Sequence, residues 1–238
     1  MRLLPSVQQH GSGARVLVNS ESADAFKTTI SEIEMLGGEA VALPFDLADG
    51  DEVRELARAT KSLAPSLDMV VCNAGITGAG IRFGDDCYED TVSPVFNINL
   101  HHCRILCDEL LPYMAETSGA AAVLTSRLSG LRGNGNIGVY SLTKAAIAQL
   151  ARDMAVKFGP RGVRINAISP GLIATGWEAN ILANPELAAR RMQMTPLRRI
   201  GQPNEIANLA VFLASDLASF ITGQNVAADG GTSITDGS

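Results

Sequence analysis

Short apolar runs alternate with longer amphipathic stretches along this chain. The runs are compact and rich in β-branched residues, which predicts buried strands at residues 14–19, 39–45, 67–72, 120–125, 163–168 and 224–228. The stretches between them repeat apolar positions at helical spacing, which predicts helices at residues 23–36, 48–64, 88–114, 135–158 and 203–214. Glycine, proline and capping residues mark the ends, with Asp49 or Asp51 suited to cap the second helix.

Strands that alternate with helices at this spacing are typical of parallel βαβ units. We therefore expect an α/β fold, a doubly wound parallel sheet with helices on both faces, in a single domain over residues 1–238. Ligands of such sheets bind beyond the carboxyl ends of the strands. Asn73, the segment after Thr125, and Pro170-Gly171 each follow a predicted strand directly, so this edge is the candidate site. The polar, Ala-rich residues 176–195 suit a substrate lid.

Composition narrows the class of partner. The 238 residues are 46% apolar, enough for one large core, and the net charge of -6 disfavours nucleic acid or an anionic membrane as partner. The sequence contains no run of eighteen apolar residues that could span a membrane. The apolar run at residues 1–7 is interrupted by Pro5 and is too short for a signal peptide. We expect a cytoplasmic protein that acts on a small molecule.

The cysteines do not form a metal-binding pattern. Cys72, Cys87, Cys103 and Cys107 are expected to be reduced thiols, mostly buried. Cys103 and Cys107 lie four apart on a predicted helix near two histidines, 101 and 102. Adjacent helical residues face different ways, so we expect no zinc site there and no metal elsewhere.

Tyr140 and Lys144 are the clearest candidate chemistry. Four residues apart on a helix, their side chains share one face. An ammonium beside a phenol favours the phenolate, which suits Tyr140 to proton transfer near neutral pH. Such a pair also occurs by chance on many helices, so it needs support from other positions.

Several motifs together supply that support. They are Asp46-Leu47, Asn73-Ala74-Gly75-Ile76, Asn99-Leu100, Tyr140-x-x-x-Lys144, Pro170-Gly171-x-x-x-Thr175, RRIGQPNEIANLAVFLASD at 198–216 and ITGQNVAADGG at 221–231. In this order the chain resembles the short-chain dehydrogenase/reductase family from about residue 14 to residue 235, most closely the branch of 3-oxoacyl-carrier-protein reductases. The resemblance implies a Rossmann-type fold and an NAD(P)-dependent oxidoreductase that transfers hydride between a nicotinamide and a carbonyl or secondary alcohol.

The resemblance also implies residue roles. Tyr140 would exchange a proton with the substrate oxygen, Lys144 would hydrogen-bond the nicotinamide ribose, and Asn99 would interrupt its helix and hold a water. The cofactor would lie against residues from three segments: Asp46, Leu47, Asn73, Ala74, Gly75, Pro170, Gly171, Ile173 and Thr175. Ser20 stands at the position where NAD-preferring members commonly carry an acidic residue, and its lack of charge favours NADP. The neighbouring Glu21 could instead bind the ribose diol of NAD, so both cofactors stay open.

Two departures from the family pattern affect the expected activity. The opening strand and its glycine-rich phosphate loop, TGxxxGxG, have no counterpart in this chain. We therefore expect a sheet without its first strand, because the start of the chain is truncated or misassigned. The alternative is that residues 3–7 rebuild something at this place. Arg127 stands at the position of the catalytic serine, with Ser126 and Ser129 as nearby hydroxyls. Arg127 could bind the substrate carbonyl, or it could leave the site inactive.

Two other functions therefore stay open. One is a catalytically impaired member that acts as an oligomeric scaffold, and the other is a cofactor-independent lyase or isomerase on the same fold. The helices at residues 88–114 and 135–158 resemble those that form family dimers and tetramers, so we expect a homodimer or homotetramer in any case.

Overall fold

The structure is a computed structural model that describes residues 14–20, 23–77, 88–135, 137–176, 181 and 183–235. Its strands are β1 (Arg15–Asn19), β2 (Glu39–Leu43), β3 (Met69–Cys72), β4 (Ala121–Thr125), β5 (Arg164–Pro170) and β6 (Asn225–Ala228). Every pairing among them is parallel, in the orders β1-β2 and β3-β4-β5-β6. The predicted strands are thus confirmed, with β5 running two residues past its predicted end because Ser169 and Pro170 still pair with β6.

The helices follow the amphipathic stretches. They are α1 (Ala23–Met35), α2 (Gly50–Leu63), α3 (Tyr88–Phe96), α4 (His102–Met114), α5 (Val139–Phe158), α7 (Pro185–Gln193) and α8 (Pro203–Ala214). Asp49 caps α2, since its carboxylate accepts from the amides of Asp51 and Glu52. A π-helical turn, Asn97–His101, divides the long helix predicted at residues 88–114.

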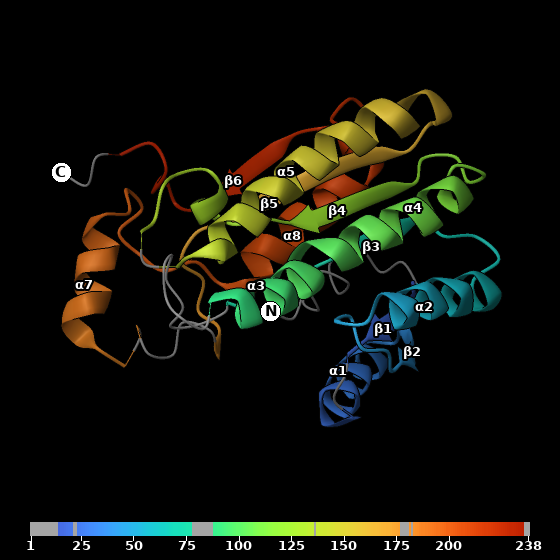
Figure 1. The fold of residues 1–238 in the computed structure, drawn as a ribbon, viewed down its shortest axis with the longest axis horizontal. Coiled ribbons are helices and arrows are strands. Elements are labelled where there is room, and N and C mark those ends of the chain that lie inside the picture. Colours follow the sequence, from blue (N-terminus) through green and yellow to red (C-terminus); the bar gives the residue numbers. More distant parts are fainter. Residues whose placement is uncertain are drawn as a thin grey trace.

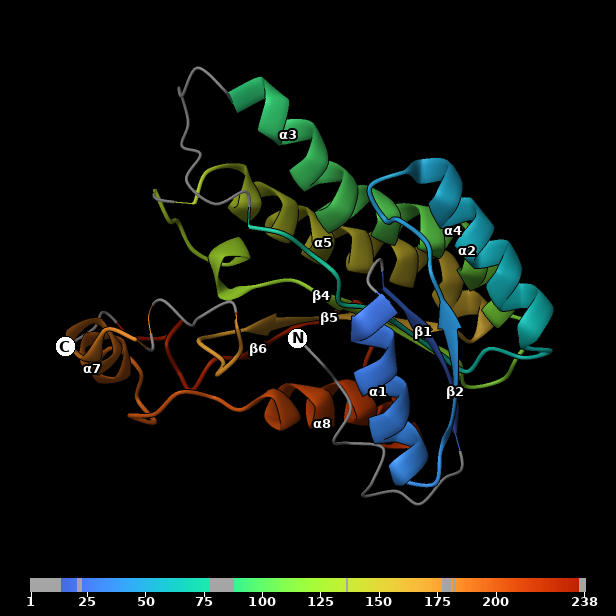
Figure 2. The same ribbon diagram turned by 90° about the horizontal axis from the view of Figure 1, so that it is seen from below.

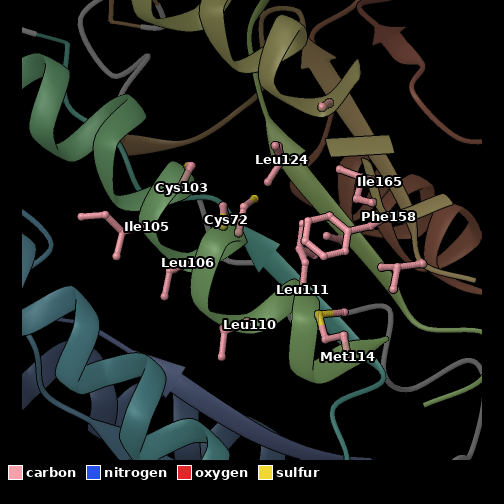
Figure 3. Close-up of a cluster of buried hydrophobic side chains, with 14 of the residues drawn as sticks. Cys72, Cys103, Ile105, Leu106, Leu110, Leu111, Met114, Leu124, Phe158 and Ile165 are labelled. Carbon is pink, nitrogen blue, oxygen red and sulfur yellow. The ribbon is translucent and has the colours of Figure 1, made fainter. Parts of the chain in front are cut away.

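Helices cover both faces of the sheet. In Figure 2, α4 and α5 lie on one side of β4 and β5, and α8 lies on the other side. The larger core cluster fills the space between α4, α5 and the sheet, and includes Leu111, Met114, Leu124, Phe158 and Ile165 (Figure 3). β5 is buried along its whole length. These layers confirm the doubly wound α/β fold.

The described strands form two separate pieces of sheet. β1 pairs only with β2, and β3 pairs only with β4, so within the described ranges no strand lies between β1 and β3. The strand that we expect to be absent would lie at this place, between β1 and β3. Residues 1–13 lie outside the described part of the chain, so the alternatives for residues 3–7 stay predictions.

The end of the molecule beyond the strands carries the predicted lid. α7 lies past the carboxyl ends of β4 and β6 (Figure 1). Asn184 caps this helix by accepting from the amide of Leu187. Trp177, within the predicted lid, lies outside the described residues. In the described ranges, no helix has the length and apolar character that crossing a membrane requires.

Candidate active site

The candidate residues gather where parallel strands end. Asn73 follows β3, Ser126 and Arg127 follow β4, and Gly171 follows β5. The Thr125 hydroxyl donates to Oδ1 of Asn73 at 3.2 Å, which joins the first two of these ends. Parallel pairing places these turns at one edge, as the sequence predicts.

Asn99 lies in the π-helical turn and is fully buried. Its Oδ1 accepts from the amide of Ile76 at 2.7 Å, and its Nδ2 donates to the carbonyl of Ile76 at 2.9 Å and to Oγ1 of Thr143 at 3.1 Å. The side chain thus joins the turn after β3 to α5. The predicted interruption of the helix at Asn99 is confirmed: the chain forms a π-helical turn there, which contains one residue more than an α-helical turn.

Lys144 is buried within this edge, with 3% of its surface exposed. Its ammonium donates to the carbonyl of Thr125 at 2.8 Å and lies 5.7 Å from the ring centroid of the buried Tyr140. The pKa of Lys144 is lowered to about 8, mainly by burial and also by the charge of Arg127, while Cys103 and Cys72 act in the opposite direction. The predicted pair therefore lies on one helix face with a cation that titrates near neutral pH.

Gly75 has a physical reason to be glycine. A Cβ on this residue would lie 3.0 Å from Oδ1 of Asn99 and 3.4 Å from Nζ of Lys144. Both contacts are tight, and neither partner is free to move away, because each is hydrogen-bonded to main chain. The turn after β3 can therefore approach the Lys144 ammonium closely only without a side chain.

The two candidate serines after β4 have different environments. The Ser126 hydroxyl is buried and donates to the carbonyl of Lys144 at 2.5 Å, so its proton is already used inside the protein. The Oγ of Ser129 is buried and has no hydrogen-bond partner in the described part of the chain. Its 3-10 turn, Leu128–Gly130, packs on α5 so closely that a Cβ on Gly130 would lie 2.7 Å from the carbonyl carbon of Lys144.

The residues expected around a cofactor divide into two groups. Near Lys144 and Asn99 lie Asn73, Ala74 and Gly75, whereas Ser20, Asp46 and Leu47 follow β1 and β2 at the far side of the sheet break. Leu47 packs against the core, and the Asp46 carboxylate accepts from the amide of Ala48 at 2.8 Å.

The third segment follows β5. A Cβ on Gly171 would lie 2.6 Å from the Cα of Asp229, so the chain turns there against the end of β6. Ile173 is buried with Ile206 in the smaller core cluster, while Thr175 is half-buried. The Ile173 side chain thus contributes to the core, and only its main chain is left for a carboxamide.

These positions fit a nicotinamide nucleotide at its ribose and nicotinamide end. The observation that carries the fit is the close approach of the turn at Gly75 to the Lys144 ammonium, which could donate a hydrogen bond to a ribose hydroxyl at this edge. When bound, such a cofactor supplies or accepts hydride. The described residues contain no glycine-rich turn that would hold the pyrophosphate.

A cavity of about 440 Å³ lies nearby. Its lining includes Ile173, Thr195, Leu197, Ala228 and Gly230. Neither Tyr140 nor Lys144 lines it, so it adjoins the end of β5 rather than the acid/base pair.

One group of residues was missed by the sequence analysis. Cys72, His102 and Cys103 bring their ligand atoms within 4.8 Å of one another, and the Cys103 sulfur lies 3.3 Å from Nε2 of His102. The reasoning that adjacent helical residues face different ways was wrong here, because the imidazole turns back over the neighbouring thiol. Cys72 lies on another element, and no spacing in the sequence indicates this contact.

The fold and the paired Tyr140 and Lys144 define the class: an α/β protein with a buried tyrosine and lysine side by side at the carboxyl edge of a parallel sheet. A family model described as enoyl-(acyl carrier protein) reductase matches residues 7–233. The chain is 34% identical to 7α-hydroxysteroid dehydrogenase of Escherichia coli K12 over 220 residues, covering 92% of this chain and 85% of the relative. It is 32% identical to 3-oxoacyl-[acyl-carrier-protein] reductase of Staphylococcus epidermidis over 229 residues, covering 95% and 91%.

Solved structures agree. A 7α-hydroxysteroid dehydrogenase complexed with NADH and 7-oxoglycochenodeoxycholic acid superposes with a TM-score of 0.87 at 32% identity, covering 95% of this chain and 87% of that one. Levodione reductase gives 0.89 at 28% identity, covering 98% and 92%. The chain belongs to the short-chain dehydrogenase/reductase family. It is thereby an NAD(P)-dependent oxidoreductase by class, and the comparisons do not favour the scaffold or the lyase.

Proposed function

We propose that this chain interconverts a carbonyl and a secondary alcohol, with Tyr140 exchanging the proton at the substrate oxygen. The observation that carries this proposal is the buried pair on α5, with Tyr140 and Lys144 on one face and the ammonium next to Gly75. A positioned phenol contributes to such a reaction because charge develops on the oxygen as hydride moves.

Lys144 and Asn99 would act around Tyr140. Lys144 would hold a ribose hydroxyl and favour ionisation of the phenol, since its charge lies 5.7 Å from the ring centroid. Both donors of the Asn99 amide are used within the protein, so any water held at this residue would bind its main chain.

Ser129 is our choice for the hydroxyl that binds the substrate oxygen. Its buried Oγ needs a partner, whereas the Ser126 hydroxyl is already bound to Lys144. Arg127 would sit beside this site as a fixed positive charge that suits a substrate with a carboxylate, because it already influences Lys144.

The cofactor would be NADP(H) or NAD(H), with a slight preference for NADP(H). Ser20 directly follows β1, at the place where an acidic side chain would otherwise bind the ribose diol. Glu21 lies outside the described residues. Parallel titrations with the two reduced nucleotides would decide between them.

Residues 176–195 would form the substrate lid of a single domain. Within this segment α7 lies at the end of the molecule beyond the strands, and the apolar residues Trp177 and Ile181 in the sequence favour an apolar carbonyl substrate. The relatives named above act on steroid and acyl-thioester ketones, so these two classes are the first substrates to try.

A homodimer or homotetramer is the assembly we propose. On α5, Val156 is 79% exposed and Leu142 is 49% exposed, two apolar side chains that a second copy would cover. Light scattering of the purified chain would give the mass. Three buried free thiols, at residues 72, 103 and 107, are compatible with the reducing cytoplasm as the place of action.

The test is replacement of Tyr140 by phenylalanine. We expect Tyr140→Phe to lower kcat at least about 100-fold for any accepted ketone, because it removes only the exchanged proton. Tyr113→Phe is the matched control: this phenol on α4 donates to the carbonyl of Ala64 at 2.6 Å, away from the site, so turnover should persist. Equal turnover in wild type and Tyr140→Phe would exclude the proposed role.

A further inference from the structure

Two thiols and an imidazole meet beneath the candidate active site. Cys72 ends β3, and His102 and Cys103 begin α4. Their exposed fractions are 4%, 1% and 2%, and their ligand atoms lie within 4.8 Å of one another. Figure 3 shows Cys72 and Cys103 inside the buried cluster between the strand and the helix.

The spacing of these atoms suits a shared cation. Metal–sulfur bonds of about 2.3 Å and metal–nitrogen bonds of about 2.0 Å place neighbouring ligand atoms roughly 3.5 to 4 Å apart around one ion. The Cys103 sulfur lies 3.3 Å from Nε2 of His102, and Cys72 completes the set within 4.8 Å. Only small movements would bring the three ligands to bonding distance.

The donor types select the kind of ion. Thiolate and imidazole ligands favour soft d10 cations such as copper(I) and zinc(II), and the set contains no carboxylate, so magnesium and calcium are disfavoured. Zinc(II) takes a fourth ligand, which is water where the protein supplies three. Burial of all three side chains leaves little access for that water. Copper(I) needs no fourth ligand, because two thiolates and one imidazole can complete its coordination.

Charge leads to the same choice. Binding copper(I) would release the two thiol protons to solvent, with the neutral imidazole donating a lone pair and no change of oxidation state. The bound cluster would carry one negative charge. Lys144, whose ammonium interacts electrostatically with both thiols, supplies the compensating positive charge.

We propose that Cys72, His102 and Cys103 form a buried three-coordinate site for copper(I). The ion would join the end of β3 to the start of α4. Gly75 lies in the turn after β3 and Asn99 in the π-helical turn before α4, and the Cys103 sulfur already lies 3.8 Å from the carbonyl oxygen of Asn99. Binding would therefore stabilise the candidate active site as well as the fold.

The test is an anaerobic copper(I) titration of the full chain against a coloured copper(I) chelator. We expect wild type to withhold one equivalent, and Cys72→Ala and Cys103→Ala each to release it. Cys107→Ala is the matched control, because this buried thiol lies one turn further along α4, outside the group of three. It should withhold the full equivalent.

A second measurement guards against misfolded variants. One equivalent of copper(I) should raise the Tm of wild type and of Cys107→Ala, and X-ray absorption should show two sulfurs and one nitrogen around the ion. The proposal is overturned if wild type withholds no copper(I), if Cys107→Ala loses it as Cys103→Ala does, or if the chain holds zinc(II) but not copper(I).

Discussion

The side chain of Asn99 is hydrogen-bonded to both main-chain groups of Ile76. Its Oδ1 accepts from the amide at 2.7 Å, and its Nδ2 donates to the carbonyl at 2.9 Å. A third bond from Nδ2 reaches Thr143 on α5, one residue before Lys144. One buried amide thus sets the distance between the turn after β3 and α5, the helix that carries Tyr140 and Lys144.

Replacement of Asn99 by alanine should therefore affect stability and turnover together. Losing the partner of buried main-chain groups costs about 1–3 kcal/mol, so Asn99→Ala should lower the free energy of unfolding by that amount in urea denaturation. Turnover should fall as well, because the turn at Gly75 is no longer held. Asn204→Ala, at an exposed position of α8, should change neither. Unchanged stability of Asn99→Ala would show that the observed bonds do not hold the turn.

Gly75→Ala tests the close approach of the turn to Lys144. The new Cβ would meet Oδ1 of Asn99 at 3.0 Å and Nζ of Lys144 at 3.4 Å, so it would shift the turn or the ammonium that we propose to hold the ribose. We expect cofactor affinity, measured by calorimetry, to fall at least about tenfold, which corresponds to about 1.4 kcal/mol. Gly133→Ala is the control, since a Cβ there has no neighbour within 4 Å. Equal affinity in both variants would place the cofactor elsewhere.

Ser126 and Ser129 should respond in opposite ways to alanine. Ser126→Ala removes a buried bond to Lys144 and should cost about 1 kcal/mol of stability. Ser129→Ala removes a buried hydroxyl without a described partner and should leave stability unchanged or higher, while kcat/KM falls. Thermal denaturation and steady-state kinetics on both variants separate the roles. A loss of kcat/KM confined to Ser126→Ala would reverse our choice.

The lowered pKa of Lys144 predicts how the free energy of unfolding depends on pH. Burial lowers its pKa from 10.5 to about 8. Between these values the unfolded chain holds the proton and the folded chain does not, so the contribution of this group makes stability rise with pH over that window. Turnover should decline as the pH rises through about 8, since the charged form of Lys144 is the one proposed to act on the ribose and the phenol.

Arg127→Ser should move the decline in turnover to higher pH. The guanidinium lowers the pKa of Lys144 in addition to burial, while Cys103 and Cys72 raise it, so removing Arg127 leaves the ammonium charged at higher pH. The pH profile of kcat/KM measures the shift. Arg132→Ser is the control, because this guanidinium donates to the carbonyl of Thr232 and is not among the groups that shift Lys144. An unmoved profile for Arg127→Ser would show that Arg127 does not act on Lys144.

The fold could be predicted from the sequence because its elements are locally encoded. Apolar runs and helical spacing give the strands and helices within a few residues, and Asp49 shows the capping chemistry that starts α2. The motif around Tyr140 and Lys144 was equally readable, since residues four apart on a helix share a face.

Contacts between distant elements could not be predicted in this way. The Ser126 bond to Lys144, the unpartnered Ser129 hydroxyl and the meeting of Cys72 with His102 depend on how a loop or strand packs on a helix. Helical spacing even gave the wrong answer for His102 and Cys103. A side chain can rotate toward its neighbour when a core encloses both.

Calorimetric titration of the purified 238-residue chain with NADPH and NADH tests the central claim most directly. An oxidoreductase with its ribose contact at Lys144 should bind one of these nucleotides with one molecule per chain, and Lys144→Ala should weaken that binding. Absence of binding by either nucleotide at millimolar concentration, with the chain shown to be folded, would contradict the account.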